Sequence, residues 1–170
     1  GTMSVMVGGD KDVFDRVAPV LDAMAGDVTH VGAIGAGNIA KLANQTIVAV
    51  NIAACAEAFT LAQKAGVDPE AVYRAIRGGL AGSTVMDAKV PMMLARDFAP
   101  GFRINLHIKD LANALDPGHG VDAPLPLTSL VREMMSVLDG DGSAAEDHSS
   151  LVKVYEKLAN IELRPGGSQD

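Results

Sequence analysis

The chain has 170 residues, of which 48% are hydrophobic, only 4% are aromatic and none is tryptophan. Alanine and the aliphatic residues must therefore fill the interior, a composition that favours packed helices over an aromatic-rich β-sandwich. The net charge of −7 argues against general nucleic-acid binding, which needs a basic face for the phosphates. A single cysteine excludes an internal disulfide. Because no signal peptide and no uninterrupted apolar run of ~20 residues is present, we expect a soluble cytoplasmic protein without membrane contacts.

The first 33 residues combine two short strands with a helix. Residues 3–7 and 28–31 are apolar runs that predict strands, and Asp10 can cap a helix over residues 11–25. The apolar residues of this helix recur at helical spacing and are expected to face a core; they are Val13, Phe14, Val17, Val20, Leu21 and Met24. A strand this close to the first residue suggests a fragment of a longer protein, and a cloning remnant before Met3 is the alternative.

Residues 37–65 predict one long helix, because they contain no proline and no glycine after Gly37. A helix of about 28 residues would be about 42 Å long. It should end at Gly66 in a left-handed C-cap. Residues 47–62 are apolar on nearly every side, so this helix is expected to be central and buried. The fold class is therefore mainly α, built round one long central helix, with two short N-terminal strands.

Five shorter helices should follow. Asp68 and Pro69 start one over residues 69–77, Ser83 caps another over 83–96, and a third covers 104–115. The sequence Pro-Gly-His-Gly at 117–120 should break the third helix. Two more are expected over 126–138 and 149–160, with Ser149 as the cap of the last. Residues 163–170 are polar and glycine-rich and are expected to form a disordered tail.

One motif suggests a nucleotide site but does not fit it. Residues 35–40 match G-x-G-x-x-A after a strand, and Glu57 lies twenty residues after Gly37. A dinucleotide-binding loop needs a second parallel strand after a helix of ordinary length, with the acid at the end of that strand. Here Glu57 falls inside the same uninterrupted helix. The glycines are therefore interpreted as allowing a tight entry into the long helix.

Lys41, Asn44 and Gln45 lie at positions i, i+3 and i+4 and share one face at the start of the long helix. An ammonium beside two carboxamides suits the reduction of a carbonyl group. The ammonium can stabilise and protonate the oxygen, and the amides can hold the lysine or a substrate hydroxyl. Alternatively, Lys41 extends into solvent and the amides satisfy nearby backbone groups. The residue pattern alone leaves both interpretations open.

The segment 35–45 resembles the catalytic-lysine signature of the β-hydroxyacid dehydrogenases. The resemblance continues through residues 77–84 and 101–111, where it is strongest to members that reduce tartronate semialdehyde, and it extends to about Ile161. It implies an NAD(P)-dependent oxidoreductase that reduces a short aldehyde-acid, such as tartronate semialdehyde to glycerate. In this family a Rossmann domain binds NAD or NADP, and a helical domain of the 6-phosphogluconate dehydrogenase type closes the site and forms homo-oligomers.

On this resemblance, residues 1–33 are the C-terminal remnant of the Rossmann domain, and residues 34–162 are the helical substrate and oligomerisation domain. Most of the cofactor site would belong to a part that precedes this chain, so the chain alone is expected to be inactive. An isolated helical dimerisation or binding module is the alternative function, and a relative of 3-hydroxyisobutyrate dehydrogenase is the alternative within the family.

The resemblance also implies roles for individual residues. Lys41 corresponds to the catalytic lysine. Many members have asparagine four residues later, where this chain has Gln45, so either Asn44 or Gln45 is expected to orient the substrate.

Three further residues are implied for the cofactor: Lys109 as a contact, Asp110 as its neighbour, and Phe102 beside the nicotinamide. The alternatives are a solvated Lys–Asp pair and a core phenylalanine. His107 and Asp110 lie three apart on a helix, but no third ligand is suggested, so no metal site is expected.

Overall fold

A computed structural model gives the structure of the chain, and residues 3–166 are described. The chain divides into two compact units, Gly1–Gln45 and Thr46–Asp170. Helix α2 (Ala36–Lys64) contributes residues to both units. The observed class is mainly helical with two short parallel strands near the N-terminus, as predicted.

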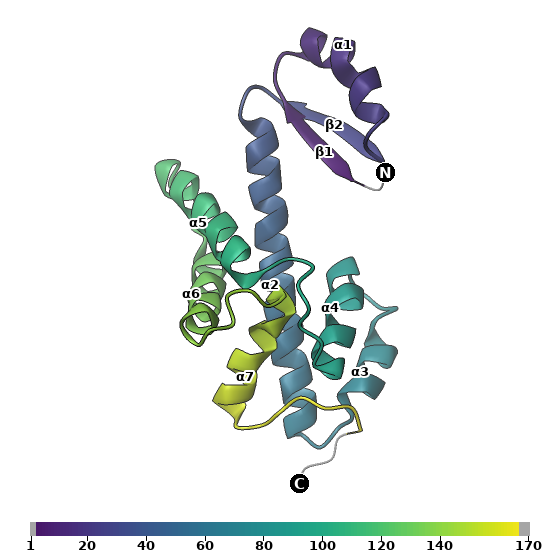
Figure 1. Ribbon diagram of the computed structural model, residues 1–170, viewed down its shortest axis with the longest axis vertical. Coiled ribbons are helices and arrows are strands. Elements are labelled where there is room, and N and C mark those ends of the chain that lie inside the picture. Colours follow the sequence, from purple (N-terminus) through teal and green to yellow (C-terminus); the bar gives the residue numbers. More distant parts are fainter. Residues whose placement is uncertain (1–2, 167–170) are drawn as a thin grey trace. The chain divides into compact units, whose positions relative to one another are not determined.

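The first unit contains β1 (Ser4–Gly8), α1 (Lys11–Asp22) and β2 (Asp27–Gly32), as Figure 1 shows. The strands pair in parallel and a helix connects them, which is the connection that a parallel pair requires. The carboxylate of Asp10 accepts hydrogen bonds from the backbone N–H groups of Asp12 and Val13, at 2.9 and 3.1 Å. Asp10 is therefore the N-cap of α1, as predicted.

The apolar face of α1 is not buried. No residue of this helix is fully buried within the chain, and Val13, Val17 and Val20 are 46%, 42% and 64% exposed. The prediction that this face contacts a core is therefore wrong for the valines and Met24, whereas Phe14 and Leu21 are half-buried and the Phe14 ring lies 5.1 Å from the imidazole of His30. A sheet of two strands is too small to cover a helix of three turns.

The entry into α2 depends on close backbone contacts at two glycines. A Cβ atom on Gly37 would lie 2.5 Å from the carbonyl oxygen of Met6, and one on Gly8 would lie 2.8 Å from the nitrogen of Gly37. Real Cβ atoms do not approach backbone this closely, so both positions need glycine. The interpretation that Gly37 allows a tight entry into the long helix is confirmed.

Helix α2 has 29 residues and ends at Gly66, whose φ of +73° is the left-handed conformation predicted for this position. The N–H of Val67 then bonds to the carbonyl of Ala62 at 2.9 Å. The buried residues form one stripe at helical spacing, which comprises Ala49, Ile52, Ala53, Ala56, Phe59 and Gln63. Ile47 and Leu61 on the other side are 64% and 69% exposed. Helix α2 is therefore central and buried along this stripe, as predicted, but it is not covered on every side by the described residues.

By length and composition, α2 is also apolar enough to cross a membrane, although the sequence pattern did not suggest a membrane-spanning run. Half of its most apolar 18-residue window is buried within the chain. Helix α2 is accordingly the core helix of the second unit.

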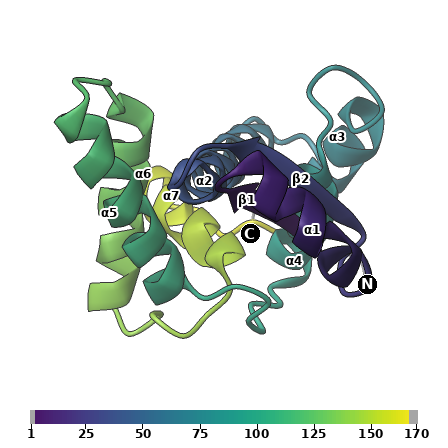
Figure 2. The same cartoon turned by 90° about the horizontal axis from the view of Figure 1, so that it is seen from above.

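Helices α3 (Pro69–Ile76) and α4 (Thr84–Ala95) follow α2, and α5 (Ile104–Gly120) and α6 (Pro126–Gly140) come next. A 3₁₀ turn (His148–Leu151) leads into α7 (Val152–Ala159). Figures 1 and 2 both show α5 and α6 side by side. The core lies where these helices pack on the buried stripe of α2; among its fully buried members are Phe59, Met93, Leu111, Met135 and Leu151.

Two predicted helix boundaries are corrected by the structure. Helix α5 continues through Pro117 to Gly120 instead of breaking there. Its last turn packs closely on the following connection, since a Cβ on Gly118 would lie 2.6 Å from the Cδ1 atom of Leu125. The last helical segment is capped by Asp147 and not by Ser149, because the Asp147 carboxylate accepts the N–H of Ser149.

The described part of the predicted tail, residues 163–166, is tied to the second unit by hydrogen bonds, and within it only Leu163 is buried. Leu163 is fully buried, and its N–H donates to the Glu156 carboxylate at 2.7 Å. The N–H of Gly166 donates to Asp68 at 2.9 Å, and Asp68 is the N-cap of α3. Residues 167–170, the rest of the predicted tail, lie outside the described residues.

Candidate active site

The polar face at the start of α2 is organised by a single oxygen atom. The Oε1 atom of Gln45 accepts hydrogen bonds from the Lys41 ammonium and from the Asn44 carboxamide, each at 3.0 Å. Gln45 is 4% exposed, whereas Lys41 and Asn44 are exposed. The three predicted residues therefore form one hydrogen-bonded group, in which a buried amide holds two exposed side chains.

This group has the chemistry of a proton donor held in place. An ammonium carries three N–H donors, and the bond to Gln45 uses one of them. The partner is a neutral oxygen and not a carboxylate, so the positive charge of Lys41 is not cancelled by this contact. A carbonyl or alkoxide oxygen within reach of such an ammonium can accept a hydrogen bond and then a proton.

Phe102 lies in the second unit, just before α5, and its backbone is fixed on both sides. Its N–H donates to the carboxylate of Asp147 at 3.0 Å, and its carbonyl accepts the N–H of His148 at 2.9 Å. Its ring lies 5.5 Å, centroid to centroid, from the imidazole of His107 and 5.5 Å from that of His148. Phe102 is half-buried, so it is more constrained than an ordinary surface aromatic residue.

Asp147 is a buried carboxylate that several groups of this region contact. Its side chain is fully buried, and both carboxylate oxygens lie 3.0 Å from the ammonium of Lys89. Burial alone would raise the pKa of Asp147. The backbone donors of Phe102 and Ser149 and the bond from Lys89 outweigh burial and lower this pKa to about 2. Asp147 is therefore a charged structural anchor for the segment before α5.

Two buried histidines complete the region. The Nδ1 atoms of His107 and His148 lie 2.9 Å apart, and the two residues are 0% and 4% exposed. Burial lowers the pKa of His148 to about 3, with further contributions from the positive charge of Lys89 and from His107. No sequence pattern indicates this pair, because the two residues are 41 positions apart and share no motif.

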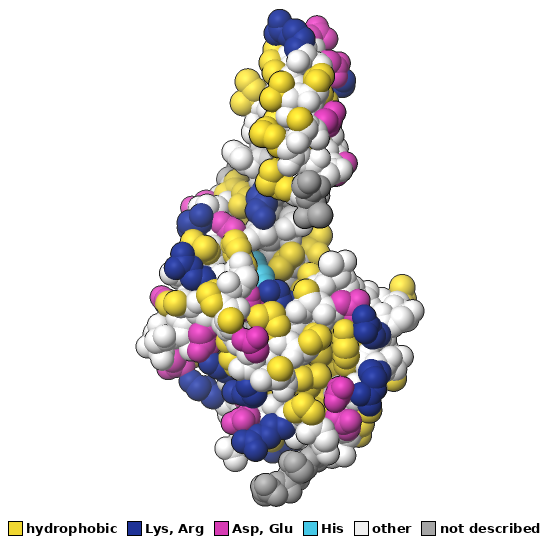
Figure 3. Space-filling model, turned by 45° about the vertical axis from the view of Figure 1, so that its right-hand side comes forward, with side chains coloured by type: hydrophobic (Ala, Val, Ile, Leu, Met, Phe, Trp, Pro, Cys, Tyr) yellow, Lys and Arg dark blue, Asp and Glu magenta, His cyan; other side chains and the backbone are white. Residues whose placement is uncertain are grey.

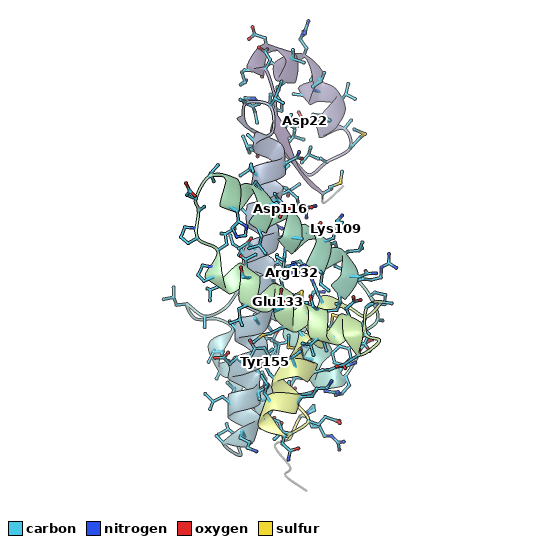
Figure 4. All side chains as sticks on the ribbon, turned by 90° about the vertical axis from the view of Figure 1, so that its left-hand side faces the viewer. Asp22, Lys109, Asp116, Arg132, Glu133 and Tyr155 are labelled. Atoms are coloured by element: carbon cyan, nitrogen blue, oxygen red, sulfur yellow. The ribbon has the colours of Figure 1, made fainter. Side chains whose placement is uncertain are left out.

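Lys109 and Asp110, the other predicted cofactor residues, lie on α5. Their side chains approach to 3.4 Å, with Lys109 64% exposed and Asp110 17% exposed. Figure 4 labels Lys109 on this helix. Among residues 3–166 no three histidine, cysteine or acidic side chains come together as metal ligands.

An apolar groove of about 730 Å³ lies in the second unit, along the middle of α2. Ile47, Val50 and Ala54 line one side, and the start of α6 at Pro126 and Leu127 lines another. Figure 3 shows hydrophobic side chains at the surface of this unit among charged ones. A groove of this kind can receive an apolar surface of another molecule.

Comparisons with known proteins agree on one family. The model described as the NAD-binding domain of NADP-dependent 3-hydroxyisobutyrate dehydrogenase matches residues 35–155. The model of the NAD-binding domain of 6-phosphogluconate dehydrogenase matches residues 1–32. The chain is 43% identical to 2-hydroxy-3-oxopropionate reductase of Escherichia coli (strain K12) over 96% of its length. It is 35% identical to 2-(hydroxymethyl)glutarate dehydrogenase of Eubacterium barkeri over 98%.

Among solved structures, the chain resembles 3-hydroxyisobutyrate dehydrogenase of Mycobacterium tuberculosis with L-serine. The TM-score is 0.84 and the identity 34%, with 91% of this chain and 55% of that chain covered. The chain spans 56% of the length of each of the two curated relatives. The family model matches most of the chain, from the glycine entry of α2 to α7. The chain therefore belongs to the NAD(P)-dependent β-hydroxyacid dehydrogenase family, of which it represents the C-terminal, mainly helical region.

Proposed function

We propose that this chain is the helical part of a cytoplasmic oxidoreductase that reduces a short aldehyde-acid, tartronate semialdehyde to glycerate, with Lys41 as the proton donor. The observation that carries the proposal is the Lys41 ammonium held by Gln45, on a segment that resembles the catalytic-lysine signature. The choice of substrate is supported by the 43% identity to 2-hydroxy-3-oxopropionate reductase. The likeness to a 3-hydroxyisobutyrate dehydrogenase makes 3-hydroxyisobutyrate the second candidate.

The residues at the start of α2 have separate tasks in this reaction. When bound, the reduced nicotinamide supplies the hydride that reaches the aldehyde carbon. Lys41 donates its proton to the former carbonyl oxygen, which becomes the new hydroxyl. Gln45 holds the ammonium in position, and the exposed carboxamide of Asn44 is placed to bind a substrate hydroxyl or carboxylate. Because Lys41 is exposed, its neutral amine can regain a proton from water.

The second unit offers two groups that fit a nicotinamide cofactor. Phe102 presents a half-buried ring for a flat heterocycle, and Lys109 presents an exposed ammonium for a polar or anionic group. The carboxylate of Asp110 lies 3.4 Å from this ammonium. The described residues contain one two-stranded sheet, so we assign most of the binding of NAD or NADP to a dinucleotide-binding part outside these 170 residues.

The decisive test replaces Lys41 in the complete protein that carries this chain. Lys41→Ala should lower kcat/KM for tartronate semialdehyde by about 10²–10⁴-fold, the range of general acid catalysis, and leave the circular dichroism spectrum unchanged. Lys41→Arg should also fail, because guanidinium does not give up its proton near neutral pH. Lys11→Ala, which removes another exposed lysine of the same unit, is the control. Retained turnover in Lys41→Ala would remove Lys41 from this role.

We also propose that the helical part forms homo-oligomers through the apolar groove along α2, with a second copy of the chain as the occupant. The exposed apolar residues on the outer side of α2 support this proposal. Sedimentation velocity should show a dimer or larger oligomer that Ile47→Asp dissociates. Leu158→Asp places the same charge at an exposed leucine of α7, outside the groove, and should leave association intact. The chain alone should show no reduction of tartronate semialdehyde, and a monomeric unmodified chain contradicts the oligomer proposal.

A further inference from the structure

We infer that the buried pair His107–His148 positions the ring of Phe102, so that both histidines are positioning residues for the proposed contact of Phe102 with the nicotinamide. The inference rests on the proposed function, which places Phe102 beside the nicotinamide. The geometry that carries it is the contact of one aromatic ring with two imidazoles that are themselves joined by a hydrogen bond.

The backbone around Phe102 already restricts where its ring can lie. The N–H groups of Gly101 and Phe102 both donate to one oxygen of Asp147, at 3.0 Å each. The carbonyl of Phe102 accepts from His148, and the N–H of Ile104 bonds to the carbonyl of Glu146 at 3.0 Å. Segment 101–104 is therefore tied to segment 146–148 at several points, and only the side-chain torsions of Phe102 remain to be fixed.

The two imidazoles fix these torsions. The Phe102 ring meets His107 nearly edge-on, at 85°, and meets His148 at 52°. Two rings at different angles leave one place for the third ring, whereas a single flat neighbour would allow it to slide. The hydrogen bond between the two imidazoles sets the angle between their ring planes, which is 46°.

The hydrogen bond assigns a proton to each ring. A contact of 2.9 Å between two Nδ1 atoms requires one donor and one acceptor. The Nε2 atom of His148 is buried and has no hydrogen-bond partner among the described residues. An unpaired N–H is the rarer and costlier case, so His148 carries its proton on Nδ1 and donates to His107.

Burial favours the neutral state of His148; the nearby charge of Lys89 acts in the same direction and that of Asp147 in the opposite one. Lys89 and Asp147 are the charged side chains that act on His148, and they form an ion pair with each other. Burial keeps the pKa of His148 at about 3, so the His148 ring is neutral near pH 7. Two apolar side chains of similar shape would pack here without an unpaired nitrogen. Compared with two apolar side chains, the histidines add a directional N–H···N hydrogen bond, which holds the two rings at a defined angle.

A double-mutant cycle in the complete protein separates positioning from plain stability. Phe102→Ala and His148→Leu should each lower kcat/KM for the reduced cofactor about tenfold, and the double variant should lose no more than either single variant, because His148 acts through Phe102. His148→Leu keeps an apolar side chain in the core, and His107→Leu breaks the same bond from the other side. His119→Leu, at an exposed histidine of α5, is the control and should keep its activity.

Each outcome has one meaning. If His148→Leu has no effect, or if its effect adds to that of Phe102→Ala, the positioning role is wrong while the proposed function stands. If Phe102→Ala itself leaves kcat/KM unchanged, the placement of Phe102 at the cofactor fails, and the positioning role with it. The role of Lys41 is tested independently by its own variants.

A second measurement needs no activity. The chain contains four phenylalanines, so 4-fluorophenylalanine gives four ¹⁹F signals, and Phe102→Leu identifies that of Phe102. In His148→Leu and in His107→Leu this signal should move toward its position in the denatured chain, while the other three stay. A Phe102 signal that remains in place in both variants overturns the inference. If one variant fails to fold, which all four signals report, the other decides.

Discussion

At the scale of single residues, the carboxamides of Gln45 and Asn44 are expected to have different roles. Its oxygen already accepts two hydrogen bonds, whereas Asn44 is exposed. We therefore expect Gln45→Ala to lower kcat about 10–100-fold by releasing Lys41, and Asn44→Ala mainly to raise KM for the aldehyde-acid. Steady-state kinetics of the complete protein measure both. The opposite split, with kcat falling only in Asn44→Ala, would assign the orientation of the lysine to Asn44.

His148 also predicts how stability depends on pH. Its pKa in the folded chain, about 3, lies below the ordinary value of 6.5, so the unfolded chain binds more protons in this range. The contribution is complete above pH 6.5 and is lost as the pH falls toward 3, with a slope that approaches ~1.4 kcal/mol per pH unit. Asp147, with a pKa lowered from 3.8 to about 2, acts in the same direction but only below about pH 4.

Urea denaturation at a series of pH values tests this dependence. His148→Leu should flatten the fall of the unfolding free energy between pH 6 and pH 4, although its absolute stability changes as well. His119→Leu removes an exposed histidine and should leave the slope unchanged. An equally steep fall in His148→Leu means that other groups cause it.

The two candidate groups of residues, one in each unit, differ in how far the sequence could reveal them. Lys41, Asn44 and Gln45 lie within five residues on one helix, so helical periodicity alone predicted that they share a face. The contacts of Phe102 depend on residues 5 and 46 positions away, which only the packing of α5 against the 3₁₀ turn brings together. No periodicity links such positions, and the histidine pair was therefore missed.

At the scale of elements, the entry of α2 is the most sensitive to a single methyl group. Gly37→Ala would place a Cβ atom 2.5 Å from a backbone oxygen of β1, which cannot move as a side chain can. We expect it to destabilise the first unit by about 1–3 kcal/mol, the usual cost of overpacking. Gly140→Ala, at the end of α6 with nothing within 4 Å, should be neutral or slightly stabilising. Hydrogen exchange of β1 and urea denaturation measure the two variants.

Three of the four expected N-caps are confirmed, and the exception is Ser149, where Asp147 is the cap instead. Asp10, Asp68 and Ser83 all cap the helices that they were expected to cap, because an N-cap is a local interaction between a side chain and the next turn. The end of α5 was missed because a tertiary contact at Gly118 outweighs the local effect of Pro117. The exposed sides of α1 and α2 were missed because an apolar pattern shows which face avoids water but not what covers it.

At the scale of the whole molecule, the two units should differ in local stability. No residue of α1 is buried and its sheet has two strands, whereas the second unit holds the fully buried cluster round Phe59. Amides of β1 and β2 should therefore exchange with deuterium at lower opening free energies than those of α2 near Phe59 and of α5 near Leu111. Hydrogen-exchange mass spectrometry of the chain measures this. Equal protection in both units would show that they open together.

The anchoring of the last described residues has a practical consequence for protein engineering. Leu163 fills the interior beside α7, and Gly166 reaches the carboxylate that starts α3. A stop codon after residue 162, or an affinity tag or fluorescent fusion in place of the residues that follow, would remove the buried Leu163 side chain. It would also remove the N–H of Gly166, which donates to the N-cap of α3. The same additions made after residue 166 leave every one of these contacts in place, so that is where a purification handle belongs.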